Sequence, residues 1–571
     1  MDIIKALTLI GGQVRVPGSL TTQSASVVAS TGFDPYGFRL RANSVTIKNF
    51  TFEQETIDAI ETNGSFSGFS ILHNRFLGDA NGITLATSSA TIAKPTTISG
   101  NYFSDSVAPA VSCILSHGGL ANVTMSNNTS KVNNATTIDI DGTSPSANVK
   151  ILNNRITGGQ GITIGNATKA KIDGNLIQPS GSNVIAIHLA GAVTGSEVAG
   201  NTLVGSYGGS TFAIGGIILD EMLINGASDT GNRISGNTIA GTPSTGDTAT
   251  GFLEGIELTQ ANNNQITGNT VVMTQSAGIA LHGASGNTIS QNVASGCMGS
   301  GIAIVGSLST GNVVKHNTAN FNNGGIAIGA LATLNKLIGN VTNFNRFFGI
   351  QIFDGAMNAL SGNTADSNLQ YGFQIASNTP GESTGNVLSG NTANGNFSRG
   401  FSVEFMSDNT TLTKNTAKNN GAAGFFIQSD ANMLLSNTAS GNGLNGIGVS
   451  GASNVVKGNI VMNNAGNGII VTGQMATISG NIAKNNQTAG IELQQLLRST
   501  VSDNVVMNNA GGIVAESSTS GNTISGNMAM GNGDAFGGFD LFDLSTGTGT
   551  AGTANTWAGN KAQTRSPAKL L

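Results

Sequence analysis

Short stretches of alternating apolar and variable residues recur along almost the whole chain. One phrase has the form Gly-[Ile/Phe]-x-[Ile/Val/Leu], as in "GITL" at 82–85, "GIAI" at 301–304 and "GIQI" at 349–352. Alternation over four or five positions is the period of a β-strand with one buried face. Helical periodicity is absent almost everywhere, so the pattern predicts an all-β protein.

A second phrase, x-[Ile/Val/Leu]-x-x-Asn-x-[Ile/Val/Ala/Phe], lies about midway between copies of the first. Between Asn269 and Asn527 its steps are 22 to 25 residues, apart from one of 28. A period near 23 accommodates three short strands separated by turns rich in Gly, Asn and Ser. The asparagine of this phrase stands at positions 49, 74, 101, 128, 154, 175, 201, 237, 269, 292, 317, 340, 363, 391, 415, 437, 459, 481, 504, 527 and 560.

One such unit cannot bury its own apolar face, so successive units must stack. The arrangement that fits is a parallel coil in which each turn lies about 4.8 Å from the last. A repeated turn asparagine can then stack on its neighbours and bond their backbones. Asparagine also tolerates a left-handed backbone, which we expect a sharp corner to require at this residue.

With these repeats, the sequence resembles the right-handed parallel β-helix proteins of the pectin-lyase-like group, whose coils read "GI-x-I … I-x-GN-x-[IVA]". The resemblance covers about residues 37–560 and implies a single β-helix domain of about 21 coils. Residues 1–36 are then a cap with the first strands, and 561–571 a C-terminal tail. The group includes polysaccharide lyases, glycoside hydrolases, uronate epimerases, phage tailspikes and surface proteins.

Composition narrows the possible partners. Charged residues make up 10% of the chain and the formal net charge is −5, without the basic stripe that nucleic-acid binding needs. Apolar runs are too short and too interrupted for a membrane span. Cys113 and Cys297 fall about seven coils, or roughly 34 Å, apart, so both should be free buried thiols. The start lacks a leader sequence and reads as the inside of a strand; we expect an extracellular or cell-surface protein.

Two steps of the repeat are unusually long, with 36 residues from Asn201 to Asn237 and 32 from Asn237 to Asn269. The excess must leave the coil as protruding loops within 204–253, at about 204–214, 221–232 and 241–253. Loops on a rigid scaffold often carry binding sites. Surface insertions are also tolerated without any function, because loop-closure entropy grows slowly with length.

The third and fifth residues of each Gly-[Ile/Phe]-x-[Ile/Val/Leu]-x strand should point to solvent. Most of these positions hold small uncharged residues. Charged or titratable residues occupy some of the remaining positions, and the long loops emerge from the same coils. An irregular strand at 184–189 would move one of these residues, His188, inward. The charged or titratable exceptions gather within 139–282: Asp139, Asp141, His188, Asp220, Glu257 and His282.

A strip of this kind suits a polysaccharide laid along the coils. Glycoside hydrolysis needs two carboxyl groups roughly 5–5.5 Å apart for retention, or 6.5–9.5 Å for inversion. Asp220 and Glu257, in neighbouring coils, are the preferred acid and base or nucleophile, and His188 and His282 would tune protonation or bind sugar. Substrate binding is assigned to Asp139, Asp141 and Tyr207.

No metal centre is predicted, and no cofactor beyond a weak Ca²⁺ possibility at Asp534, Asp540 and Asp543. The different-class alternative is a non-catalytic adhesive or virion module, either monomer or trimer. It is favoured by the lack of a complete catalytic signature. A lyase or epimerase is the second alternative, for which Arg39 and Arg41 are the best basic group, although capping explains them more simply.

Overall fold

The computed structural model describes residues 1–571 apart from a set of short segments. Contacts divide the chain into two units, Met1–Gly299 (unit 1) and Ser300–Leu571 (unit 2). The segments left undescribed are 12, 16–21, 25–26, 30–35, 54–56, 63–65, 87–93, 105–111, 118, 134, 143, 182–183, 206–212, 221–226, 242–250, 534–537 and 571.

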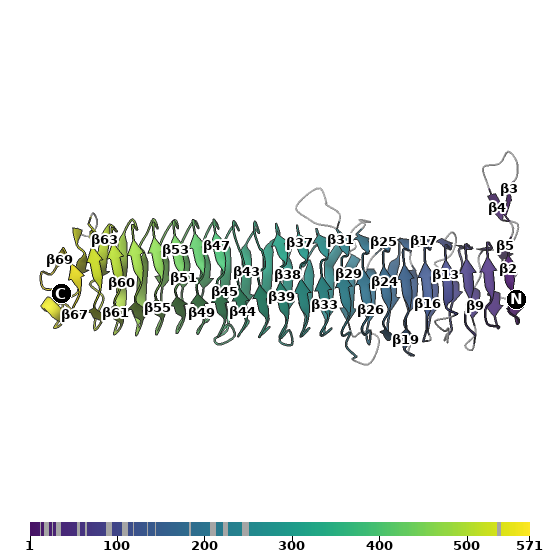
Figure 1. The fold of residues 1–571 in the computed structure, drawn as a ribbon, viewed down its shortest axis with the longest axis horizontal. Helices are drawn as coiled ribbons and strands as arrows, with labels where there is room; N and C mark the ends of the chain where they lie inside the picture. The colour runs from purple at the N-terminus through teal and green to yellow at the C-terminus, as the bar shows by residue number, and fades with distance from the viewer. Residues whose placement is uncertain are drawn as a thin grey trace. The chain divides into compact units, whose positions relative to one another are not determined.

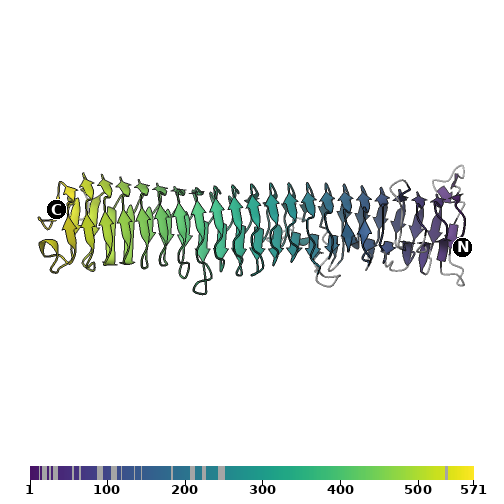
Figure 2. The same cartoon turned by 60° about the horizontal axis from the view of Figure 1, so that its bottom comes forward.

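Each unit is a stack of coils whose strands form three parallel sheets, here called A, B and C (Figures 1 and 2). The Gly-[Ile/Phe] phrases form sheet A. Its strands in unit 1 are β1 (Asp2–Ile3), β6 (Tyr36–Leu40), β9 (Asp58–Thr62), β12 (Asn81–Thr84), β15 (Ser112–Ser116), β18 (Thr136–Ile140), β22 (Gln160–Ile164), β26 (Ile185–Ala190), β29 (Ala213–Asp220), β32 (Phe252–Thr259) and β35 (Ile279–His282).

In unit 2, the Gly-[Ile/Phe] phrases again form sheet A, whose strands pair in parallel. Its strands are β38 (Ser300–Val305), β41 (Gly324–Gly329), β43 (Phe348–Phe353), β45 (Tyr371–Ala376), β48 (Phe401–Val403), β51 (Phe425–Ile427), β54 (Ile447–Val449), β57 (Ile469–Gln474), β60 (Ala489–Leu497), β63 (Gly511–Ala515), β66 (Leu541–Asp543) and β69 (Arg565–Ser566).

Sheets B and C flank the ladder asparagine and consist mostly of three-residue strands. Sheet B runs from β2 (Thr8–Ile10) to β36 (Thr288–Ser290) in unit 1 and from β39 (Val313–Lys315) to β67 (Thr556–Ala558) in unit 2. Sheet C runs from β5 (Val27–Ala29) to β37 (Val293–Ser295) in unit 1. In unit 2 it runs from β40 (Thr318–Asn320), through single bridges, to β68 (Lys561–Ala562).

The predicted all-β parallel β-helix is therefore confirmed. Apart from Gly538, which is also in 3₁₀ conformation, the helical residues among those described form one 3₁₀ turn, η2 (Thr550–Gly552), and none is an apolar helix of membrane-spanning length. Two minor pairs lie outside the three sheets. They are the antiparallel pair β3 (Gln13–Arg15) with β4 (Thr22–Ser24) and the parallel pair β19 (Ser146–Ala147) with β23 (Ala167–Thr168).

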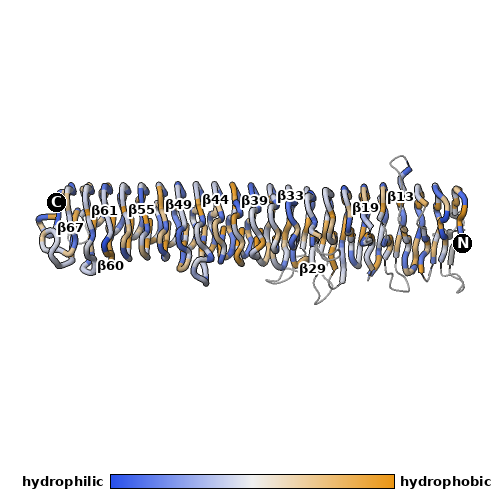
Figure 3. Tube along the Cα trace, turned by 90° about the horizontal axis from the view of Figure 1, so that it is seen from below, coloured by the Kyte–Doolittle hydropathy of each residue, from blue (hydrophilic) through white to orange (hydrophobic). Residues whose placement is uncertain are grey.

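The core is a set of columns in which the same inward position is filled coil after coil. Figure 3 shows apolar and polar residues alternating along the trace. In unit 1, Phe52, Phe76 and Phe103 stack with ring centroids 5.0 and 4.7 Å apart. In unit 2, three rings at one inward position of sheet A stack with centroids 4.7 and 4.8 Å apart: Phe373, Phe401 and Phe425.

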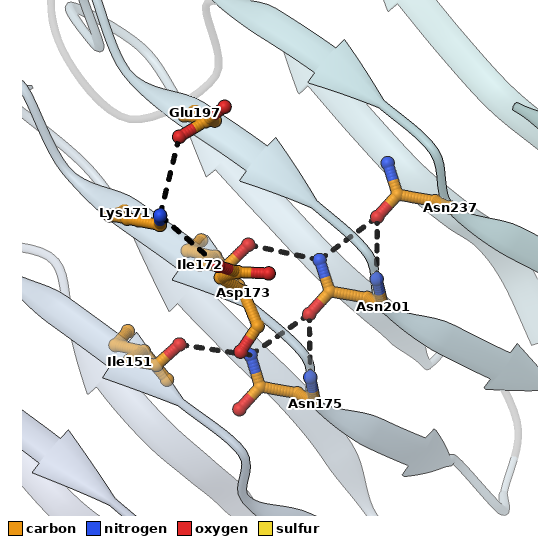
Figure 4. Close-up of polar contacts among 8 residues, drawn as sticks. All are labelled: Ile151, Lys171, Ile172, Asp173, Asn175, Glu197, Asn201 and Asn237. Atoms are coloured by element: carbon orange, nitrogen blue, oxygen red, sulfur yellow. Dashed lines mark hydrogen bonds and ion pairs between the residues drawn. The ribbon is translucent and has the colours of Figure 1, made fainter. Parts of the chain in front are cut away.

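The turn asparagines form the predicted ladder of side-chain amides (Figure 4). Nδ2 of Asn175 donates to the backbone oxygen of Ile151 and to Oδ1 of Asn201, both at 2.9 Å. The backbone N–H of Asn175 donates to the same Oδ1, also at 2.9 Å. The backbone N–H and Nδ2 of Asn201 donate in the same way to Oδ1 of Asn237. Each amide thus satisfies backbone groups at a corner, where the strand ladder stops.

The expected left-handed backbone is found one residue earlier than predicted. The ladder asparagines have negative φ, and the residue before each is the left-handed one, for example Gly174 at φ 68° and Gly200 at φ 60°. Glycine adopts this conformation without a Cβ clash, which explains the frequent "Gly-Asn" pairs. Asn49 itself has φ 62°, so it occupies the left-handed position and Phe50 takes the ladder slot, where its backbone N–H donates to Oδ1 of Asn74 at 3.0 Å.

A second ladder in unit 2 ends on a carboxylate. Oδ1 of Asp540 accepts both the backbone N–H and Nδ2 of Asn532 at 3.0 Å, and its Oδ2 accepts the N–H of Gln563 at 2.9 Å. Asp543 accepts the Trp557 indole N–H at 2.7 Å. These two residues of the weakly predicted Ca²⁺ group therefore close the last coils; Asp534 lies outside the described residues.

Cys113 and Cys297 are both buried free thiols, as the coil spacing predicted.

The ladder gives a direct stability test. Asn437 is fully buried, and its Nδ2 donates to Leu412 and Asn459 while its Oδ1 accepts from Asn415. Asn437→Ala leaves several buried groups without partners, so we expect a loss on the order of 3 kcal/mol and a fall in Tm of several degrees.

Asn419→Gly is the matched control for thermal or denaturant unfolding. Asn419 is an exposed left-handed corner residue of the same region, with φ 53°. Its replacement should leave Tm nearly unchanged. Equal effects of the two substitutions would contradict the ladder's role in stability.

Candidate active site on sheet A of unit 1

The predicted outward column exists as a continuous register across β18 to β35. Asp139 pairs with Thr163, Thr163 with His188, and His188 with Ile218. Ile218 pairs with Glu257, and Glu257 with Ala280. The coil at 184–189 is shifted by two residues from the expected alignment, so His188 lies in the column of Glu257 and not in that of Asp220, while it keeps the face that Asp220 shares. Asp220 and Glu257 lie on neighbouring strands as expected. This shared face of β18, β22, β26, β29, β32 and β35 is called the acidic face below.

His188 and Asp220 form a close buried pair on this face. Nε2 of His188 lies 3.0 Å from Oδ2 of Asp220, and both side chains are about nine-tenths covered. The two atoms are close enough for an ion pair, but they do not have the geometry of a hydrogen bond. The register explains their meeting, because Asp220 pairs with Ala190, two residues beyond His188. Sequence reasoning placed both residues on one face but did not foresee the pairing.

Glu254 is a site residue that the sequence analysis missed. Its carboxylate lies 3.2 and 3.4 Å from Nε2 of His282, and its side chain is 10% exposed. This hydrogen bond raises the pKa of His282. An ion pair of this kind orients the imidazole and favours its charged form.

A glycine explains why Glu254 and Glu257 share a face. In a regular strand, residues three apart point to opposite sides. A Cβ on Gly255 would point into the core, against Val271 and 2.6 Å from the carbonyl oxygen of Gly278, and Ile256 is also fully buried. Two successive inward residues shift the alternation as a bulge does, which re-aims Glu254 outward. The phrase "EGIE" at 254–257 is therefore the sequence signal that could have identified Glu254 as a residue of this face.

Glu257 lies between the two pairs. Its Oε1 accepts a hydrogen bond from Oγ1 of Thr259 at 2.9 Å. Burial raises the pKa of Glu257, the nearby Glu254 carboxylate raises it further, and Asp220 adds to the same effect. Glu257 is therefore a carboxyl group that retains its proton to higher pH than an exposed glutamate.

The other end of the acidic face holds a second carboxyl group of this kind. Burial, followed by the charge of Asp141, raises the pKa of Asp139 to about 6. Asp141 itself lies 3.0 Å from Nδ1 of His117, an exposed histidine that the sequence analysis did not select because it follows β15 rather than lying in it. His188 also acts on Asp139, so the charges form one connected series.

One group on this face could hold a metal ion. Ligand atoms of Glu254, Glu257 and His282 lie within 4.8 Å of one another. Zn²⁺ and similar ions take such mixed carboxylate and imidazole sets. The same side chains are already engaged by the His282–Glu254 contact and by Thr259, which accounts for their arrangement without an ion.

Several predictions concern residues that the structure does not describe. Tyr207 lies outside the described residues, as do 206–212, 221–226 and 242–250 of the predicted loops. The basic group of the lyase alternative is described. Arg39 lies 3.7 Å from Glu61, and Arg41 lies 3.1 Å from Asp2. Both arginines thus neutralise carboxylates in the first coils.

A comparison with models of protein families identifies the family to which the repeat belongs. The model described as "Right handed beta helix region" matches residues 159–342, 254–410 and 405–554, which together exceed half of the chain. The chain belongs to the right-handed beta helix family. A second model, described as "Periplasmic copper-binding protein (NosD)", matches residues 23–212. A search of curated proteins found no match.

Solved structures of right-handed beta helix proteins resemble this chain in fold at low identity. A mutant of the periplasmic alginate epimerase AlgG is 13% identical, over 68% of this chain and 76% of that chain, with a TM-score of 0.33. The Azotobacter vinelandii mannuronan C-5 epimerase AlgE6 A-module is 12% identical over 74% and 92%, with 0.29. Bacteriophage CBA120 tailspike protein 3 is 11% identical over 72% and 53%, with 0.28.

The raised pKa of Asp139 gives a pH-dependent prediction. The folded state holds this proton up to about pH 6, whereas an unfolded aspartate loses it near 3.8, so stability falls as pH rises through that window. Asp139→Asn should therefore raise Tm at pH 7.5, and the gain should vanish near pH 4.

Asp173→Asn is the comparison for this measurement, because Asp173 is an exposed partner of Lys171. It should leave Tm unchanged or lower it slightly at pH 7.5. A gain from Asp139→Asn that is independent of pH would contradict the assignment.

Proposed function

We propose that this protein binds a polysaccharide along the acidic face of unit 1 and hydrolyses it, with Asp220 and Glu257 as the carboxyl pair. The observation that carries the proposal is the connected series of buried and half-buried carboxyl and imidazole groups from Asp139 to His282. In a chain with 10% charged residues and five histidines, three histidines contact carboxylates on this sheet. Such acid–base groups serve glycoside hydrolysis.

The roles follow from the surroundings of each carboxyl group. Glu257, whose pKa is raised, is the general acid that protonates the glycosidic oxygen. Asp220, held beside His188, is the base that activates water. His282 and Glu254 position the acid, and Asp139 and Asp141 bind sugar further along the face.

Register favours inversion over retention. Glu257 pairs with Ile218, and Asp220 stands two residues further along β29. A strand spacing of about 4.8 Å and a two-residue advance of about 6.6 Å place the two Cα atoms about 8 Å apart. Side chains that leave the sheet in parallel carry this separation to their carboxyl groups, and it then falls in the range of roughly 6.5–9.5 Å that inverting enzymes use to leave room for the attacking water.

The protein is proposed to work outside the cytoplasm. The NosD match over residues 23–212 supports this location, because that family is described as periplasmic.

Substitution of the carboxyl pair tests the proposal. Glu257→Gln and Asp220→Asn should each lower polysaccharide turnover by roughly 10²–10⁴-fold, as measured by new reducing ends, while thermal unfolding shows that both variants remain folded at the assay temperature. Wild-type turnover should fall as pH rises through the raised pKa of Glu257, and the product anomer should be inverted. Glu197→Gln, an exposed carboxyl group that faces Lys171, is the control.

Two outcomes would contradict the hydrolase assignment. Unsaturated products would identify a lyase. An absence of turnover on every polysaccharide, with the fold intact, would leave a non-catalytic surface or virion module.

Chelation gives a separate prediction. Because the proposed chemistry uses only side chains, turnover should be unchanged in EDTA. Loss of turnover in EDTA, restored by Zn²⁺ or Ca²⁺, would reassign Glu254, Glu257 and His282 from acid–base work to metal binding.

A further inference from the structure

Unit 2 carries a ladder of planar polar side chains on the outward face of sheet A. Nε2 of Gln351 on β43 donates to Oε1 of Gln374 on β45 at 2.7 Å. Nε2 of Gln374 donates in turn to Oε1 of Glu404, just beyond β48, at 3.0 Å. All three residues are half-buried, so they present hydrogen-bonding edges to solvent in a fixed order.

Arg399 extends this ladder and joins it to aromatic rings. Its Nη1 donates to Ser402 at 3.2 Å and lies 3.9 Å from Oε1 of Glu404. Its guanidinium also lies 3.6 Å from the ring centroid of Phe426 and 5.9 Å from that of Tyr371. Stacking and ion pairing together hold the guanidinium in one place.

A row of exposed apolar side chains borders the ladder. It lies in the turns that lead from sheet C into sheet A. Two of its rings, Phe321 and Phe344, stack with centroids 5.2 Å apart, and Phe397 is 79% exposed. The row, called the corner strip here, consists of Phe321, Phe344, Phe347, Leu369 and Phe397.

We propose that the corner strip and the Gln351–Glu404 ladder form a binding surface for an uncharged polysaccharide. Sugar rings have apolar C–H faces that pack on aromatic rings, and hydroxyl edges that bond to amides, carboxylates and guanidinium groups. The surface offers both kinds of contact on successive coils. Exposed apolar patches bordered by polar groups mark binding sites.

The polar border favours a sugar over a hydrocarbon or protein partner. A lipid surface or a second apolar face that covered the strip would also desolvate the ladder. It would leave the amides of Gln351 and Gln374 without the hydrogen bonds they make to water, which is costly. Charge points the same way, because the cations and anions of this surface are equal in number. Arg399 lies 3.9 Å from Glu404, and Arg346, which lies over the Phe347 ring, has Asp366 in the next coil.

This surface requires no catalysis and shares no residue with the acidic face of unit 1, so it goes beyond the function proposed above. Affinity electrophoresis of the full chain tests it, in native gels that contain hydroxyethylcellulose, xylan or galactomannan, with alginate as the charged comparison. At least one uncharged polymer should retard the protein. Phe344→Ala/Phe397→Ala and, separately, Gln374→Leu should weaken this binding about tenfold.

Controls separate the two proposals. Glu257→Gln should abolish turnover and leave retardation unchanged, so loss of one property does not decide the other. Met475→Ala, an equally exposed apolar residue of unit 2, should have no effect on binding. Tm measurements verify that each variant is folded.

Three results would overturn the assignment. The first is a lack of retardation by every uncharged polymer. The second is retardation that the strip and ladder variants leave intact. The third is a fall in sedimentation coefficient in Phe344→Ala/Phe397→Ala at equal Tm, which would show that the strip binds a second copy of the chain.

Discussion

The corner amide bond is the interaction on which the coil depends. Strands of three residues end before their backbone groups are all paired, and the turns that follow are too tight for water to enter the interior. The asparagine side chain has two donors and one acceptor on a short stem, so it bonds to the coil before and the coil after it, as Asn175 does with Ile151 and Asn201. Serine has too few donors, and glutamine is longer by one methylene group.

A constant register follows from this bond and makes the acidic face possible. When every coil is held at the same corner, residues at equal positions in the repeat lie one strand apart in space. Asp139, His188 and Glu257 are distant in sequence, yet they share a single column. The site needs no special fold of its own. It needs only charged residues at positions where most coils have small ones.

Much of this arrangement could be predicted from the sequence, because period 23 and period 2 are both visible in it. The strands, the ladder and the shared outward face of Asp220, Glu257 and His282 follow from counting. Counting fails where strict alternation of inward and outward residues stops. Glu254 was missed because Gly255 and Ile256 both face inward, and the left-handed residue was misplaced by one because asparagine and glycine both tolerate that conformation. His117 lies beyond a strand end, where no periodicity applies.

The second ladder of unit 2 also has a direction, and its last member differs chemically from the others. Every internal asparagine receives from one neighbour and gives to the other, so a coil duplicated or deleted as a whole leaves all of these groups satisfied. A gene for such a chain can therefore lengthen or shorten in units of one coil, whereas a single inserted residue disturbs the register. Asp540 is the exception: a carboxylate has no N–H of its own to pass on, so the series of amides can stop there.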